Sequence, residues 1–485
     1  MGNIQSISYF FPELVLTATV VVALIADLVY SDRNSYKVGY LVIAGLAIAS
    51  LVLWLSPPGE TTPIFLNTIV VDPFSRIFKF VFLLATFFVI LMSINSDELK
   101  SVRTGEYYTL MAVMVLGMSL MASSVDLIMV YLSIEVVSIV SFILAGYLRA
   151  QVRSNEAALK YVIYGAFSSG LMLYGLSLLY GLTGTTKLFE LSGAISSLGP
   201  GSNLTLTVAT ILIMAGFGYK VAMVPFHFWT PDVYEGAPTP VTAYLSVAPK
   251  AAGFALLIRF FNTLFGTGQP LNSPVWQAME GVPWQDVIMV LAAVTMTVGN
   301  LVAIQQQNIK RLLAYSSIAH AGYILMGVPV LSQDGVYAII FYIIVYLFMQ
   351  LGAFFLAIVV SNKYGTEAIE EYSGIGWKSP YLGFFMAVFM FSLTGIPPTA
   401  GFIGKMYLFA ALINGGSQFY WLAIIGVLNS VISLYYYMRV VKVMYFQGER
   451  EKDLYVPGGM SMLFFSPRVF LQSFSAFGGR SCLIG

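Results

Sequence analysis

Four ionisable residues lie within long apolar stretches of this 485-residue chain. Glu135 (YLSIEVVSIVSF) and Lys250 (AYLSVAPKAAGFALL) fall near the middle of their stretches, whereas Lys220 (IMAGFGYKVAMVPFHFW) and Lys405 (GIPPTAGFIGKMYLF) lie beside prolines. A charge at the centre of a bilayer costs about 2.5–3.5 kcal/mol on insertion scales, so such residues are functional candidates by default. Burial disfavours the charged form of a lysine, and a nearby carboxylate favours it. These residue types therefore predict side chains that load and release protons inside a membrane.

Two other interpretations apply to the same residues. Lys220 and Lys405 lie near helix breaks, so their ammonium groups could extend to the membrane interface along their apolar stems. A static buried ion pair is the second alternative, but three lysines and one glutamate leave cations without a partner. His227 and His320 are the only histidines, and each is either a further proton carrier or a hydrogen-bonded structural residue.

The elements that must position these residues are transmembrane helices. Of all residues, 58% are hydrophobic and 10% are charged, whereas roughly a quarter of a soluble domain is charged. About 20 apolar residues span a bilayer as a helix. We predict an all-α polytopic membrane protein of 13 crossings, with residues 458–485 as a candidate fourteenth. The runs are 8–30, 38–55, 74–95, 107–123, 125–148, 157–182, 204–224, 239–262, 286–305, 311–331, 335–361, 380–413 and 419–446.

Prolines predict breaks in the seventh, eighth and twelfth crossings, at Pro225, Pro249 and Pro397–Pro398. Proline removes a backbone donor and clashes with the preceding turn. The seventh and twelfth crossings share one plan, a long apolar run with a proline-containing break and a lysine. An offset of five crossings reverses their orientation, so helices 4–8 and 9–13 are expected to form an inverted repeat, as in many transporters. The expected segments are 1–106, 107–265, 266–446 and 447–485.

Lys and Arg predict the orientation, because cytoplasmic loops carry an excess of both. They concentrate in the loops that follow odd-numbered crossings, among them Arg33, Lys100, Arg103, Arg149 and Arg153. The amino terminus is therefore expected outside the cell. Arg259, near the end of the eighth crossing, is expected to extend to the interface.

Several kinds of site are excluded by composition. Cys482 is the only cysteine, whereas an iron–sulfur cluster usually takes about four. GFGYKV lacks the third glycine of a dinucleotide fingerprint. A net charge of +1 gives no basic patch for nucleic acid. We therefore expect no cofactor, no metal and no nucleic-acid partner for this chain.

Several strings resemble chain N of bacterial NADH–quinone oxidoreductase (respiratory complex I), a family of antiporter-like membrane subunits. They are KVAMVPFHFWTPDVYEGAPTPVTAYLSVAPKAAGFALLIR, QNIKRLLAYSSIAHAGY, SLTGIPPTAGFIGKMYLF and LNSVISLYYYMRVVKVMY. The resemblance runs from about residue 10 to 446, and the tail after about residue 450 departs from it. It implies fourteen helices with inverted repeats of helices 4–8 and 9–13.

The resemblance also implies roles for the four charged residues. Glu135 and Lys220 are similar to the partner glutamate and lysine of helices 5 and 7. Lys250 matches the connecting lysine of broken helix 8, and Lys405 the helix 12 lysine that exchanges protons with the outside. A lysine at that last position favours chain N over chain M, which usually has glutamate there.

The implied function is proton translocation as a subunit of NADH:quinone oxidoreductase in a bacterial inner membrane. Iron–sulfur clusters, flavin and quinone are expected in partner subunits, and the implied neighbours are chains M and L and the small chains K and J. The alternatives are a subunit of a cation/proton antiporter, a related ferredoxin- or plastoquinone-linked complex, or a membrane scaffold.

Overall fold

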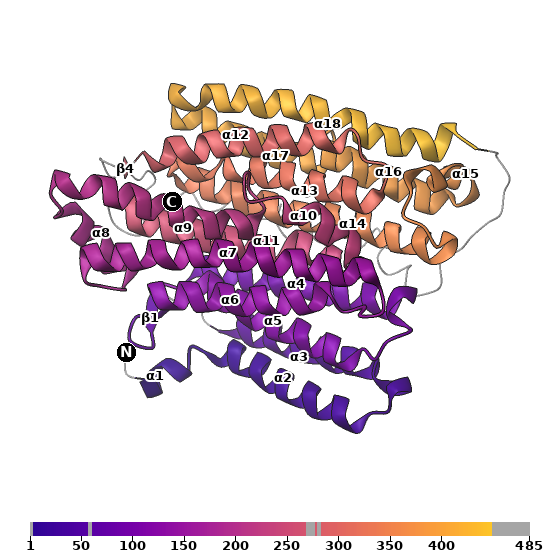
Figure 1. Cartoon of the computed structure of the whole chain (residues 1–485), viewed down its shortest axis with the longest axis horizontal. Coiled ribbons are helices and arrows are strands. Elements are labelled where there is room, and N and C mark those ends of the chain that lie inside the picture. Colours follow the sequence, from indigo (N-terminus) through magenta and orange to yellow (C-terminus); the bar gives the residue numbers. More distant parts are fainter. Residues whose placement is uncertain (1–2, 57–60, 268–276, 279–282, 449–485) are drawn as a thin grey trace.

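The chain folds into long helices that run roughly side by side, as the computed structural model shows (Figure 1). The structure describes residues 3–56, 61–267, 277–278 and 283–448. Among these residues, twelve helices are long and apolar enough to cross a membrane. They are α2 (Phe11–Val29), α3 (Lys37–Leu55), α4 (Pro73–Ile94), α5 (Gly105–Ser123), α6 (Leu127–Ala145), α7 (Val152–Thr183), α9 (Asn203–Val221), α11 (Thr239–Phe265), α12 (Trp284–Ala303), α13 (Ile309–Leu325), α14 (Gln333–Tyr364) and α18 (Tyr420–Phe446).

A further predicted run, 380–413, falls on two shorter apolar helices, α16 (Pro380–Thr394) and α17 (Ala400–Gly415). Each of the thirteen predicted runs thus coincides with a helix or a helix pair, which confirms the all-α membrane fold. The candidate fourteenth crossing, 458–485, lies outside the described residues.

Short elements lie at the two ends of the long helices (Figure 1). The hairpin β1–β2 (Thr62–Ile64 with Ile69–Val71), the hairpin β3–β4 (Gly266–Thr267 with Gln277–Ala278) and α8 (Leu188–Ser196) lie toward one end. Helix α15 (Ile375–Lys378) lies at the other end. Helix α1 (Asn3–Ile7) precedes α2, and α10 (Trp229–Gly236) follows α9.

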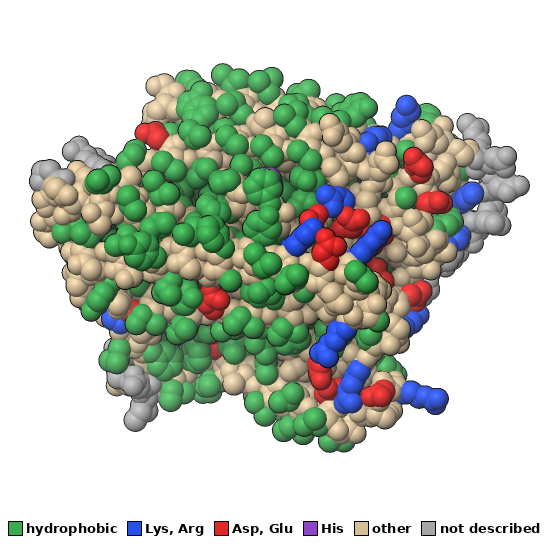
Figure 2. Space-filling view, in the orientation of Figure 1, with side chains coloured by type: hydrophobic (Ala, Val, Ile, Leu, Met, Phe, Trp, Pro, Cys, Tyr) green, Lys and Arg blue, Asp and Glu red, His purple; other side chains and the backbone are tan. Residues whose placement is uncertain are grey.

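The charged side chains gather near the α15 end, whereas apolar side chains cover the middle of the molecule (Figure 2). We call this the charged end; it includes residues 30–36, 96–104, 146–151, 304–308 and 365–379. Arg103 there bonds to Asp27 and Asp32, each at 3.1 Å. The hydrogen bond to Asp27 raises the pKa of the exposed Arg103 guanidinium above its ordinary value. An apolar middle with polar ends is the distribution that a bilayer imposes.

Helices α11, α13 and α14 form the centre of the bundle. The most apolar window of α11 is completely buried, and those of α13 and α14 are almost so, whereas α2, α3 and α7 expose most of theirs. Apolar surface can face lipid without cost, so the outer helices need no polar face. The ionisable residues on the central helices are therefore shielded from lipid by protein.

Two of the three predicted breaks are present. Helix α9 ends at Val221, Ala222 adopts a left-handed conformation (φ 60°), and the helix resumes as α10. Helix α16 likewise ends before Gly395 (φ 85°), and α17 begins at Ala400.

The third predicted break is wrong, because α11 is one continuous helix with Pro249 inside it. Proline removes one hydrogen bond from the helical ladder. Neighbouring elements compensate for such a loss in transmembrane helices, and α11 is packed on all sides.

Arg259 does not extend to the interface, contrary to the sequence expectation. Its guanidinium forms two hydrogen bonds to the Asp72 carboxylate, at 2.8 and 2.9 Å, and both side chains are buried. Nε donates to the Ala122 carbonyl. Asp72 also caps α4 through the Ser75 amide. Burial alone would raise the pKa of the Asp72 carboxyl, but the Arg259 guanidinium holds it below its ordinary value. The pair ties α11 to the start of α4.

Candidate functional site

Lys220 lies in the last turn of α9, immediately before the first helix break, and its side chain is buried. Its ammonium donates to Ser138 Oγ of α6 at 3.1 Å. Ser138 follows Glu135 by about one turn of α6, so Lys220 contacts α6 close to Glu135. The ion pair implied by the family resemblance is not formed in this structure.

Glu135 lies at the margin of the bundle. It is half-buried, and its Oε1 is buried without a hydrogen bond from any described residue. The apolar side chains of Leu132, Val136 and Ile139 beside it are exposed. A buried carboxylate oxygen without a donor is costly. The position of Glu135 therefore suits a group that gains a partner when Lys220 moves or when a neighbouring subunit covers α6.

Lys250 is buried at the centre of α11. Its ammonium donates to Ser317 Oγ and to the Ser317 carbonyl oxygen, the latter at 3.3 Å. It also lies 5.7 Å from the ring centroid of Tyr234, a buried residue of α10. Lys250 therefore contacts α13 on one side and the second part of the broken crossing on the other.

Lys405 lies in α17, one turn beyond the second break. Its ammonium reaches back to the last carbonyls of α16, donating to Thr394 O at 2.8 Å and to Leu393 O at 3.4 Å. Free carbonyls at a helix carboxyl terminus attract a cation. Ser430 Oγ accepts a further hydrogen bond at 3.1 Å, and the ring centroid of Tyr323 lies 4.3 Å from the ammonium. The Lys405 side chain is buried among these groups.

His320 lies on α13 between the contacts of the two lysines. Its Nδ1 lies 2.7 Å from Tyr342 OH, and its Nε2 lies 3.1 Å from Tyr437 OH. Ser317, His320 and Tyr323 follow one another at intervals of three residues, so they lie along one side of α13. This stripe contacts Lys250 at Ser317 and Lys405 at Tyr323, with the imidazole between them.

His227 lies in the segment between α9 and α10 and is also buried. Its Nδ1 has no hydrogen-bond partner among the described residues, and its ring packs on Phe228 with centroids 4.4 Å apart. The structure thus places His320 between the α13 residues that contact Lys250 and Lys405, and it leaves His227 in the break.

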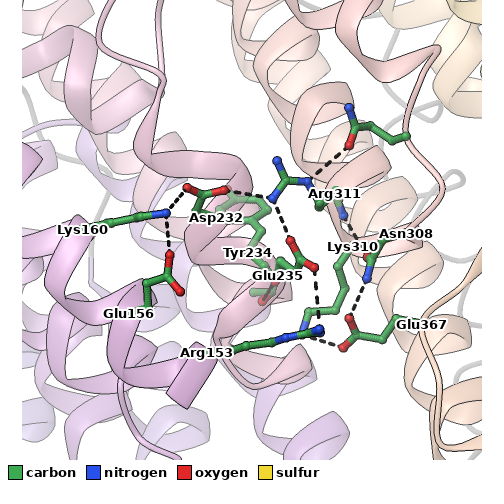
Figure 3. Close-up of polar contacts among 12 residues, drawn as sticks. Arg153, Glu156, Lys160, Asp232, Tyr234, Glu235, Asn308, Lys310, Arg311 and Glu367 are labelled. Carbon is green, nitrogen blue, oxygen red and sulfur yellow. Dashed lines mark hydrogen bonds and ion pairs between the residues drawn. The ribbon is translucent and has the colours of Figure 1, made fainter. Parts of the chain in front are cut away.

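A cluster of ion pairs fixes α10 to both halves of the bundle at the charged end (Figure 3). Asp232 bonds to Lys160 of α7 at 2.6 Å and to Arg311 of α13 at 2.9 Å. Glu235 also bonds to Arg311, at 2.7 Å. Nearby, the buried Lys310 pairs with Glu367 at 2.8 Å. The cluster therefore fixes the second part of the broken crossing against its neighbours.

A cavity of about 700 Å³ lies beside this cluster, lined by Glu98, Glu235, Lys310 and Glu367 among others. Glu98 accepts hydrogen bonds from the amide and the hydroxyl of Thr239, the first residue of α11. Tyr234, adjacent in sequence to the cavity-lining Glu235, contacts Lys250. The cavity is thus a polar space at the charged end, and one of its lining residues, Glu235, is next in sequence to the residue that contacts Lys250.

Sequence reasoning did not find Ser138, Ser317, Tyr323 and Ser430, the polar partners of the three lysines. Each of them lies on a different helix from the lysine that it contacts, and no pattern within one helix connects the two. The three-residue spacing in SSIAHAGY was a usable signal, because it places Ser317, His320 and Tyr323 on one side of a helix.

The arrangement defines a class of membrane subunit with two broken crossings and a chain of buried lysines between them. The family described as "NADH:quinone oxidoreductase/Mrp antiporter, TM" matches residues 124–433, and the chain belongs to this family. Among its relatives are proteins named NADH-quinone oxidoreductase subunit N 2 and NADH-quinone oxidoreductase subunit N. The one from Chloroherpeton thalassium is 48% identical and aligns over 92% of this chain and 86% of its own length. The one from Chlorobium chlorochromatii is 47% identical over 91% of this chain and 85% of its own length.

Solved structures show the same fold. A chain of respiratory complex I from Thermus thermophilus with bound aureothin superposes with a TM-score of 0.75 at 30% identity, over 96% of this chain and 97% of that one. A chain of the Mrp complex from Dietzia has a TM-score of 0.76 at 25% identity, over 95% of this chain and 84% of its own.

Proposed function

We propose that this chain is a proton-translocating membrane subunit of NADH–quinone oxidoreductase. The relatives that carry this name align over most of the chain, and the family covers both broken crossings. The single observation that carries the proposal is the stripe on α13. It brings the contacts of Lys250 and Lys405, which are 155 positions apart in sequence, to one side of a helix with His320 between them.

The proton enters from the charged end and moves along the buried side chains. Lys220, held by Ser138 near Glu135, is the carrier in the first half, residues 107–265. Lys250 receives the proton from Lys220, or from the cavity past Tyr234. His320 and its tyrosine neighbours connect Lys250 with Lys405 in the second half, residues 266–446, and Lys405 releases the proton toward the opposite end. His227 is a further candidate carrier in the first break.

Quinone reduction in partner subunits drives this transfer. Iron–sulfur clusters, flavin and quinone belong to those partners, which include chains M, L, K and J. Glu135 lies at the bundle margin with one unpartnered oxygen, a position where a neighbouring subunit can change its environment. The charged end faces the cytoplasm of a bacterium and the amino terminus lies outside, because cytoplasmic loops are rich in Lys and Arg.

The test uses the complete complex in proteoliposomes, where NADH oxidation and proton uptake are measured together. Lys250→Ala should lower proton uptake in an assembled complex. Normal uptake would contradict the proposal.

A cation/proton antiporter subunit is the second candidate function, favoured by the similarity to the Mrp complex of Dietzia. Sodium movement across vesicles without NADH, abolished by Lys250→Ala, would favour this candidate. Proton uptake that requires NADH and a quinone favours the first.

A further inference from the structure

Two buried asparagines form a side-chain pair between α12 and α18 that the proton path described above does not use. Asn300 Nδ2 donates to Asn429 Oδ1 at 3.1 Å, and both residues are buried. An amide buried at membrane depth is costly unless its polar atoms are hydrogen-bonded. The pair is therefore expected to have partners for its remaining atoms.

The remaining amide atoms of the pair are hydrogen-bonded. Asn429 Nδ2 donates to the Ile425 carbonyl at 3.0 Å and to Thr297 Oγ1 at 3.2 Å. A carbonyl can only accept, so this contact sets the orientation of the Asn429 amide and turns its oxygen toward Asn300. Asn300 Oδ1 in turn accepts from Tyr436 OH at 2.9 Å. The Asn300 amide is thus held in one orientation from two sides.

The Asn300 amide nitrogen also points toward a residue that contacts Lys405. Asn300 Nδ2 lies 3.4 Å from Tyr323 OH, and Ser430 Oγ lies at the same distance from that hydroxyl. The Lys405 ammonium contacts α13 at the Tyr323 ring face and α18 at Ser430 Oγ. Both groups therefore meet at the Tyr323 hydroxyl, to which Asn300 also donates.

We propose that Asn300, oriented by Asn429, is a positioning residue for proton transfer at Lys405; this inference rests on the proposed function. Asn300 does not contact the ammonium and acts through Tyr323. Without the Asn300 donor, Ser430 is the one group of those named here that still holds the Tyr323 hydroxyl, so the ring is less firmly fixed against Lys405. If the ring turns away, the ammonium keeps Ser430 Oγ and the carbonyls of Thr394 and Leu393 but loses the ring face.

A purely structural role would give the pair a different task, the joining of α12 to α18. Hydrogen bonds between membrane helices contribute modestly to stability. Loss of pumping in a stable, assembled complex therefore separates the two roles.

The experiment measures protons taken up per NADH oxidised by the whole complex in proteoliposomes. Asn300→Leu keeps the approximate volume and removes both polar atoms, and it should lower this ratio below the wild-type value, because the Tyr323 ring is no longer held against Lys405 from α12. Gln285→Leu is the matched control. It removes an amide of the same helix that donates to the Pro329 carbonyl at 2.7 Å, and it should pump normally.

The double variant Asn300→Leu with Lys405→Ala gives the readout that a structural role would not produce. A residue that acts through Lys405 has no further effect once Lys405 is absent, whereas independent effects multiply. If the double variant is no worse than Lys405→Ala alone, the positioning role is supported; a multiplied loss overturns it.

Three further outcomes are decisive. If Asn300→Leu does not assemble, Tyr323→Phe removes the same hydrogen bond from the other side and keeps the ring; normal pumping by that variant overturns the inference. If Lys405→Ala inactivates the complex but Asn300→Leu pumps normally, the positioning role alone is overturned. Normal pumping by Lys405→Ala overturns the proposed function and the positioning role together.

Discussion

Lys250 and Lys405 contact the same side of α13 six residues apart, the first at Ser317 and the second at Tyr323. Six residues of α-helix rise about 9 Å, a distance that one imidazole with its hydrogen-bonding neighbours can cover. His320 lies midway and contacts Tyr342 and Tyr437. The lysines need no direct contact, because α13 supplies the intermediate groups.

His320→Gln tests this connection. Glutamine can hydrogen-bond to both tyrosines but cannot carry a proton, so it retains the packing and removes the transfer. The rate of proton uptake by proteoliposomes should fall well below that of the wild type, because a positioned proton-transfer group contributes about 10²–10⁴-fold. If His320 were only a hydrogen-bonded core residue, the glutamine variant would pump nearly as well as the wild type.

Glu135→Gln tests the first half of the path. The amide keeps the volume and loses the charge that favours the ammonium form of Lys220. We expect an assembled complex with lower proton uptake and weakened coupling to NADH oxidation. Glu156→Gln is the matched control, because that carboxylate is exposed and pairs with Lys160 at the charged end. Equal pumping by the two variants would remove Glu135 from the proton path.

Lys250→Ala should block transfer between the two halves, and NADH oxidation should fall with it if coupling is tight. Lys250→Arg should also be poor, because a guanidinium stays protonated under working conditions and cannot pass its proton on. Proton uptake and NADH oxidation are measured for both variants after assembly is checked. Normal pumping by the arginine variant would show that Lys250 is a fixed charge.

Arg259→Leu is a prediction about stability. Removing one partner of a buried ion pair leaves the other uncompensated and costs about 3–5 kcal/mol. The pKa of Asp72 is lowered in the folded wild-type chain, so the pair contributes its stability at neutral pH and loses it as pH falls through that lowered pKa. Without Arg259, burial disfavours the charged carboxylate, so the cost of the substitution declines as acid protonates Asp72. The thermal unfolding midpoint of the purified complex should fall clearly.

Lys100→Ala provides the comparison, because it breaks an exposed pair with Asp97 and should cost no more than about 1 kcal/mol. Equal midpoints for the two variants would show that the Arg259–Asp72 pair does not stabilise the fold.

The sequence predicted the crossings and singled out the three lysines that the structure buries, because apolar length and a charge within it are local signals. Pro249 misled the prediction, because a proline removes only one hydrogen bond and the packing around α11 decides whether the helix continues. Arg259 was misplaced because its partner Asp72 lies 187 residues away. The Lys220 contact with Ser138 was likewise invisible, as no pattern within either helix connects them.

Lys405 allows the proton path and the interface interpretation to be tested against each other. Its ammonium is buried among the Thr394 carbonyl, Ser430 and the Tyr323 ring, so a carboxyl group placed there meets a polar environment. A glutamate can still carry a proton, and Lys405→Glu should therefore keep partial pumping. Lys405→Ala removes the carrier and should lose most of it. A lysine that only extends to the interface predicts the reverse order, because alanine is mild in an apolar helix and a buried glutamate is costly. Proton uptake by vesicles carrying each assembled variant gives the order, and better pumping by alanine than by glutamate would exclude Lys405 from the path.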